Sequence, residues 1–261
     1  MAKFIVVGER IHCISPSIKK ALAERNPEPV LARAKAQIEA GADYLDVNIG
    51  PGGEDAEDLM KWAVTTIQGA CDDIPLALDT ANTKAIEAGL SVYSRKKGKP
   101  VINSADAGDR IGNIDLAAAN DAIVIALCAA GSIAADNDER MAYCQTMLER
   151  GLTLGMSEND IWFDPSFVVV KGMQEKYTEI LEALKLFKDM GLNSTGGISN
   201  NSNGAPKSVR PVMDATLISM AMACGLSSAI CNPCDERVMQ AIKTADIFLG
   251  NTLYADSYLE I

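Results

Sequence analysis

The sequence predicts an α/β protein built as a single (β/α)8 (TIM) barrel. Eight short apolar runs alternate with helix-like stretches along the 261 residues. The first and last runs end at Glu9 and Asn232, which implies about 32 residues per unit, and one βα unit takes roughly 30 residues. No shift in composition marks a boundary, so residues 1–261 are expected to form one domain.

The alternative architecture is a doubly wound open sheet. Such sheets normally carry a glycine-rich fingerprint directly after the first strand. The corresponding segment here, VVGERI at 6–11, contains one glycine, which favours the barrel.

The expected strands are short apolar runs that end on turn-forming or polar residues. In chain order they span 4–11, 44–50, 74–80, 100–107, 122–129, 161–167, 192–200 and 227–233.

The helices between these runs have recognisable patterns. Ile86, Leu90 and Tyr93 recur at helical spacing and predict one apolar face. Asp136 followed by Glu139 is typical of a helix N-cap and its partner three residues on. The segment 209–225 is apolar nearly all round, which predicts a well-buried helix.

Composition restricts the class of function. A net charge of −11 excludes a general binder of nucleic acid or anionic membranes, because both require a basic surface. No apolar run reaches the ~20 residues of a membrane span, so we expect a cytoplasmic protein. Cys231 and Cys234 form a lone CxxC, and the chain has only one histidine. We therefore expect no zinc site.

Polar residues end seven of the eight expected strands, while the fifth ends in Cys128 and alanines. The polar set is Glu9, Asp46, Asn48, Asp79, Asn103, Asp106, Asp164, Asn200 and Asn232. Asp46 and Asn48 have the same parity, so they should face the same side of their strand. At any one position, such residues could simply cap the next helix or form a turn.

In a barrel, however, the strand ends meet at one mouth. We find no lysine or arginine among the converging acids, so they require another partner. Two candidates remain open: a hard divalent cation, which takes oxygen ligands, and a neutral heterocycle rich in N–H groups, such as a pterin.

A set of motifs extends this interpretation over nearly the whole chain. In order they are GERI (8–11), LDVNIGP (45–51), LDTANTKAIEAGL (78–90), INSADA (102–107), FDP (163–165), GISN (197–200), RP (210–211) and AMACGL (221–226). This set resembles the methyltetrahydrofolate:corrinoid protein methyltransferases. Those enzymes are similar in fold to dihydropteroate synthase and to the folate module of cobalamin-dependent methionine synthase.

The resemblance implies roles for eight positions of this chain. Four side chains would contact the pterin, with Asn200 at N5. Those four are Asp79, Asn103, Asp164 and Asn200; the supporting positions are Asp46, Ser199, Ile230 and Arg210. Our own hypothesis is that Asp79 and Asn103 also serve catalysis, by relaying a water that is the proton source.

The resemblance also implies substrates and partners. A methyl group would move between a corrinoid (cobalamin) and N5 of tetrahydrofolate, and the protein would be a homodimer. A separate protein should carry the corrinoid, because the chain has no D-x-H-x-x-G signature. Departures from the family at His12, 128–138 and 201–206 favour a tetrahydrofolate-methylating role in a demethylase system over the reverse reaction of the acetyl-CoA pathway.

Four rival functions remain. Dihydropteroate synthase would need a basic R-x-H near the C-terminus, which the chain lacks. A Schiff-base aldolase could use Lys171, and a metal-dependent lyase could use Asp46, Asp79 and Asp164. A non-catalytic pterin carrier is the rival outside enzymes.

Overall fold

The computed structural model describes residues 3–259 and confirms the single (β/α)8 barrel; residues 1–2 and 260–261 of the expected domain lie outside this range. All pairings between neighbouring strands are parallel. The strands follow the order β7-β6-β5-β4-β3-β2-β1-β8. They are β1 (Ile5–His12), β2 (Tyr44–Asn48), β3 (Leu76–Asp79), β4 (Val101–Asp106), β5 (Ile123–Leu127), β6 (Ile161–Asp164), β7 (Asn193–Ser194) and β8 (Ser228–Cys231).

The ring closes between the last two strands through a short contact. Gly197 forms an isolated parallel bridge with Ile230, and the Ile230 N–H donates to the Gly196 carbonyl at 3.0 Å. The segment after β7 therefore completes the barrel wall that an open sheet would lack.

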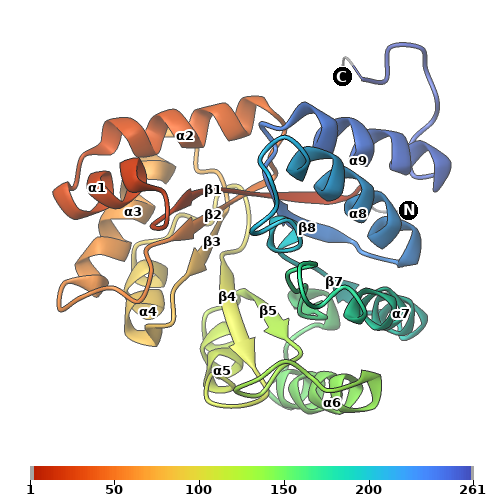
Figure 1. Ribbon diagram of the computed structural model, residues 1–261. Coiled ribbons are helices and arrows are strands. Elements are labelled where there is room, and N and C mark those ends of the chain that lie inside the picture. The colour runs from red at the N-terminus through yellow and green to blue at the C-terminus, as the bar shows by residue number, and fades with distance from the viewer. Residues whose placement is uncertain (1–2, 260–261) are drawn as a thin grey trace.

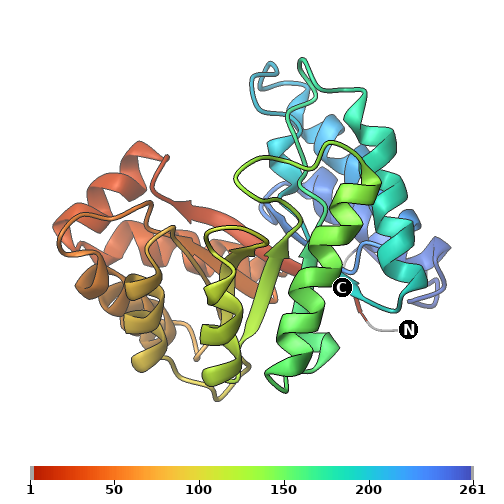
Figure 2. The ribbon, with the colours of Figure 1, turned by 90° about the horizontal axis from the view of Figure 1, so that it is seen from below.

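Helices surround the strands (Figures 1 and 2). The α-helices are α1 (Pro16–Glu24), α2 (Pro27–Glu39), α3 (Ala56–Ala70), α4 (Thr83–Ser91), α5 (Gly112–Ala119), α6 (Asn137–Thr153), α7 (Lys176–Asp189), α8 (Arg210–Cys224) and α9 (Glu236–Phe248). Two short 3-10 helices, η1 (Glu158–Asp160) and η2 (Ile198–Asn200), complete the elements. As predicted, α6 begins at an Asp136 cap, whose carboxylate accepts from the Glu139 N–H at 2.9 Å.

The expected strand 192–200 is wrong over most of its length. Only Asn193 and Ser194 form a strand, and residues 198–200 form η2. A Cβ at Gly196 would lie 2.3 Å from the ring of Phe167. The chain therefore passes too close to the loop after β6 for any larger residue, and its strand pairing with β6 ends at Ser194.

The expectation of a well-buried 209–225 helix is also wrong. Helix α8 buries one stripe, centred on Leu217, Ile218 and Ala221. Val212 and Met220 remain 52% and 49% exposed. The helix lies on the outside of the barrel (Figure 1), so only one face of it meets the strands.

The inside of the barrel is filled by a small apolar layer that supports the site above it. Val7, Ala77, Val101, Ile125 and Trp162 belong to this cluster. Because strand side chains alternate, the residue two positions further along β1, β3, β4 and β6 faces the same interior. In each of these strands that residue is polar: Glu9, Asp79, Asn103 and Asp164.

Candidate functional site

A cavity of about 680 Å³ opens at the carboxyl ends of the strands. The structure brings all eight positions singled out from the sequence to its lining. They are Asp46 on β2, Asp79 on β3, Asn103 on β4, Asp164 on β6, Ser199 and Asn200 on η2, Arg210 on α8 and Ile230 on β8.

One wall of the cavity alternates carboxylates with amides. Asn48, Asp79 and Asn103 are register partners on three adjacent strands. The Asn48 Nδ2 donates to Asp79 Oδ2, and the Asn103 Nδ2 donates to Asp46 Oδ1 at 2.9 Å. Each acid is thus held by a neighbouring amide, which fixes its orientation toward the cavity.

Burial makes the ionised forms of these acids costly. It raises the pKa of Asp46 well above its usual value, and the nearby Asp79 carboxylate raises it further, although the Asn103 hydrogen bond lowers it. Burial also raises the pKa of Asp79 to about 6, against the lowering effects of Asn48 and Arg110. A ligand that donates N–H groups would favour the ionised carboxylates.

Asp164 approaches the cavity from β6. Its Oδ1 accepts from the Ser166 N–H at 2.8 Å, in a turn where Ser166 has a left-handed φ of 70°. Burial raises the pKa of Asp164 to about 6, while the Ser166 and Phe167 N–H groups lower it. No side-chain donor within residues 3–259 satisfies this carboxylate, which leaves it available to a ligand.

Glu9 and Ser199 join β1 to η2. The Ser199 Oγ donates to Glu9 Oε2 at 2.7 Å. Burial raises the pKa of Glu9 to about 7, although the Ser199 bond lowers it. Glu9 also lines the cavity. Its position at a strand end predicted this location, although the resemblance implied no role for it.

Asn200 follows Ser199 on η2 and lines the same cavity. Its side-chain amide forms no hydrogen bond with any other residue that the structure describes. An amide carries both donor and acceptor atoms, so Asn200 can bind a ligand nitrogen in either protonation state.

The mouth carries arginines that the strand-end argument missed. Arg10, His12 and Arg33 line the mouth together with Arg210, so the expectation of no arginine among the acids is wrong. The β1–β2 register shifts between Gly8 and Ile11. This irregularity breaks the alternation of β1 and lets consecutive residues face the cavity.

Two of the polar strand ends lie outside the cavity lining and have ordinary structural roles. Asp106 forms an ion pair with Arg110 at 2.8 Å and accepts from the Gly108 N–H. The Asn232 Oδ1 accepts from the Cys234 N–H at 3.2 Å. For these two, the reading as turn residues was correct.

The structure also shows where the residues of the aldolase and metal-lyase alternatives lie. Lys171 is exposed and does not line the cavity. Within residues 3–259, no group of three His, Cys, Asp or Glu side chains could hold a metal ion. Cys231 is buried and Cys234 is exposed.

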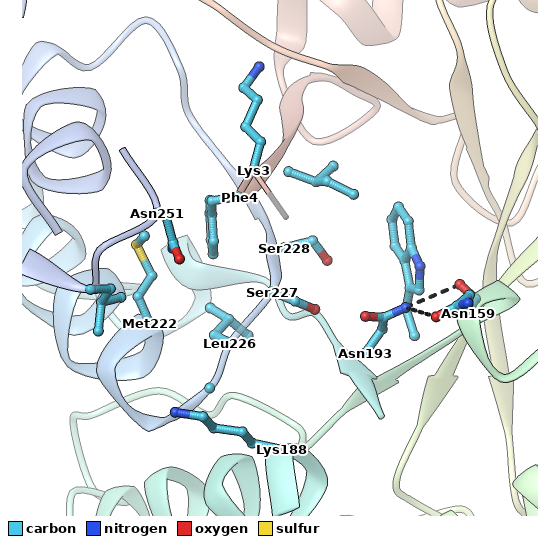
Figure 3. Close-up of a pocket in the computed structure, with 14 residues that line it drawn as sticks. Lys3, Phe4, Asn159, Lys188, Asn193, Met222, Leu226, Ser227, Ser228 and Asn251 are labelled. Carbon is cyan, nitrogen blue, oxygen red and sulfur yellow. Dashed lines mark hydrogen bonds between the residues drawn. The ribbon is translucent and has the colours of Figure 1, made fainter. Parts of the chain in front are cut away.

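A second cavity, of about 520 Å³, lies at the amino ends of the strands (Figure 3). Phe4, Ser227 and Ser228 line it, and Asn193 there donates to Asn159. It contains none of the eight predicted residues. In this fold, chemistry takes place at the carboxyl ends, so the first cavity is the candidate site. No helix of the described chain is long and apolar enough to cross a membrane.

Comparison with known sequences places this site in context. Residues 14–232 match the family described as pterin binding enzyme. The chain is 26% identical to a methylcorrinoid:tetrahydrofolate methyltransferase of Eubacterium limosum, covering 97% of this chain and 94% of that one. It is also 26% identical to a methionine synthase of Mycobacterium tuberculosis, covering 88% of this chain but 20% of that protein.

Solved structures share the fold. A dihydropteroate synthase of Coxiella burnetii in complex with pteroic acid superposes with a TM-score of 0.74 at 17% identity, covering 97% of this chain and 95% of that one. A Yersinia pestis dihydropteroate synthase with a pterine-sulfa conjugate gives 0.72 at 16% identity, covering 95% of each chain.

Proposed function

Because the chain belongs to the family of pterin binding enzymes, we propose that it moves a methyl group between N5 of tetrahydrofolate and a corrinoid carried by a separate protein. The observation that carries this proposal is the convergence of four polar side chains, Asp79, Asn103, Asp164 and Asn200, on one cavity. A relative that matches nearly end to end and is named for this reaction supports it.

The pterin ring explains why the acids are buried. Its N3–H and 2-amino groups lie on one edge and can donate in a bidentate way to Asp164. Asp79 and Asn103 would contact the rest of the ring, and Asp46 would hold the Asn103 amide through its 2.9 Å bond. Ser199, Ile230 and Arg210 complete the pocket.

Asn200 would act at N5. In the demethylase direction, N5 of tetrahydrofolate would take the methyl group and lose its proton, and the partner's corrinoid would supply that methyl group and keep the electrons of the broken bond. The Asn200 carbonyl can accept from the N5–H of tetrahydrofolate. In the reverse direction its Nδ2 can donate to N5 as the carbon–nitrogen bond breaks, because a tertiary amine leaves poorly without a donor. A water relayed by Asp79 and Asn103 would carry the proton.

The corrinoid would supply the methyl group. The sole histidine of the chain, His12, lies outside a D-x-H-x-x-G sequence and lines the cavity beside the arginines. We therefore assign the corrinoid to a partner protein. We propose that the physiological direction is methylation of tetrahydrofolate in a demethylase system, with the acetyl-CoA-pathway direction as the alternative.

We also propose that the enzyme acts in the cytoplasm as a homodimer. Apolar side chains exposed on α8 and α9, among them Val212, Met220 and Phe248, offer a surface on which two copies could pack. Light scattering of the full chain should give the mass of a dimer, and a monomer at all concentrations would contradict the assignment.

Methyl exchange tests the function directly. The full chain is incubated with methylcobalamin and tetrahydrofolate, or with a methylated corrinoid protein, and the cobalt absorbance is followed. We expect the spectrum of the demethylated corrinoid to appear with the unaltered protein and to appear more slowly with Asn200→Ala. Lys171→Ala should leave the rate unchanged, because it alters an exposed lysine outside the cavity.

If tetrahydrofolate binds but no methyl exchange occurs with either methylcobalamin or the methylated corrinoid protein, the result would instead support a non-catalytic pterin carrier. Absence of tetrahydrofolate binding would refute the pterin site itself.

A further inference from the structure

The cavity has two zones of opposite electrical character. The aspartates Asp46, Asp79 and Asp164 line it from the strand ends, whereas Arg10 and Arg33 line it from β1 and α2. The chain as a whole has a net charge of −11. The two arginines are therefore a local concentration of positive charge on an acidic chain, beside the carboxylates of the same cavity.

The two guanidinium groups lack ion-pair partners. Within residues 3–259, neither Arg10 nor Arg33 uses its side chain in a hydrogen bond or salt bridge. By contrast, Arg25, Arg110 and Arg150 each pair with an aspartate at 2.7–2.8 Å. An unpaired arginine presents a planar fork of donors suited to a carboxylate.

The two arginines are held in place by the contact between β1 and α2. The Arg10 N–H donates to Gln37 Oε1 at 2.8 Å. This contact requires Gly8, because a Cβ there would lie 2.6 Å from the same oxygen. Arg33 precedes Gln37 by four residues, so both lie on one face of α2. The same packing thus positions Arg10 and Arg33.

Both arginines lie close enough to His12 to affect its charge. Burial lowers the pKa of His12, and Arg10 and Arg33 both lower it further. The two guanidinium groups therefore both affect the same side chain, His12, which is the single histidine of the chain.

We propose that Arg10 and Arg33 form a subsite for the γ-glutamyl tail of folate, so that the enzyme prefers oligoglutamyl tetrahydrofolate. This inference rests on the proposed function. A folate has an N–H-rich pterin at one end and carboxylates at the other, which matches the aspartates and the arginines of the cavity. Each added glutamate brings one further carboxylate to the arginines.

The test compares ligands that differ only in the tail. Dissociation constants are measured by calorimetry on the full chain for tetrahydropterin without a tail and for tetrahydrofolate with one and with three glutamates. We expect the triglutamate to bind about threefold to tenfold more tightly than the monoglutamate, since exposed charge pairs contribute modestly. The ratio should fall toward one as salt rises.

Variants separate the subsite from general charge effects. Arg10→Gln and Arg33→Gln should each reduce the triglutamate-to-monoglutamate ratio, and together abolish it, while tetrahydropterin binding is unchanged. Arg237→Gln is the matched control, because Arg237 is exposed on α9 and does not line the cavity. Thermal melting would verify that each variant is folded.

Equal affinities for the two tails in the unaltered protein would overturn the subsite. A triglutamate-to-monoglutamate affinity ratio that stays the same in the double variant would also overturn the subsite. If methyl exchange with a corrinoid protein fell in that variant, the two arginines would instead contact the protein partner. Failure of tetrahydropterin to bind at all would instead refute the proposed function.

Discussion

Replacing Glu9 with glutamine should make the stability of the protein less dependent on pH. The carboxyl group is buried against Ser199, and its pKa is raised from 4.5 to about 7. It therefore binds a proton more tightly in the folded chain than in the unfolded chain. The resulting stability is fully present below about pH 4.5 and is lost as the pH rises through about 7.

The magnitude follows from the two pKa values of Glu9. A change from 4.5 to about 7 corresponds to about 3 kcal/mol over the full range, of which about 2.5 kcal/mol falls between about pH 5 and pH 8. Asp79 and Asp164 also have raised pKa values, of about 6. The unaltered protein should therefore lose more stability than Glu9 alone predicts, and only the difference from Glu9→Gln isolates this residue.

Urea unfolding at about pH 5 and pH 8 measures this difference. The glutamine carbonyl can still accept from the Ser199 hydroxyl, so Glu9→Gln should lose about 2.5 kcal/mol less than the unaltered protein between the two conditions. Glu54→Gln is the control, because Glu54 is exposed. Parallel losses in Glu9→Gln and the unaltered protein would refute the reasoning.

Other predictions concern single positions. Asn200→Ala should lower the rate of methyl exchange about 100-fold or more and change tetrahydrofolate affinity little; equal losses in both would count against activation at N5. Asp164→Asn should weaken pterin binding about tenfold to 100-fold in a titration, because it removes a charged acceptor. Gly196→Ala should lower the free energy of unfolding by about 1–3 kcal/mol, since the added Cβ would lie 2.3 Å from the ring of Phe167. Treatment with EDTA should leave exchange intact, because the Asn103 and Asn48 amides donate to Asp46 and Asp79; a loss restored by magnesium would argue for a cation in the site.

Much of the site could be predicted because strands impose a period of two. Asp79, Asn103 and Asp164 each lie two residues after an apolar side chain of the barrel interior, and a reader of the sequence can count this spacing. The barrel itself followed from the regular length of the βα unit. The expected strand ends therefore identified the residues that line one cavity.

The missed features depend on contacts that alternation does not encode. Arg10 faces the cavity because the β1–β2 register shifts, and Arg33 comes from a helix, where no strand-end rule applies. Asn200 lies on a 3-10 turn because Gly196 passes close to Phe167. Each of these requires knowing which segments pack together, and the exposed stripe of α8 likewise depends on which side of that helix meets the barrel.

Because β7 is short, the residues of the pocket come from two kinds of element. Asp46, Asp79, Asn103 and Asp164 belong to strands of four to six residues, whereas Asn200 sits beyond a strand of two. Under the proposed function, strand residues would therefore bind the heterocycle, whereas a residue on a separate turn would contact the reacting nitrogen. An engineer seeking to transfer a different one-carbon unit would leave the strand residues intact and vary residues 198–203.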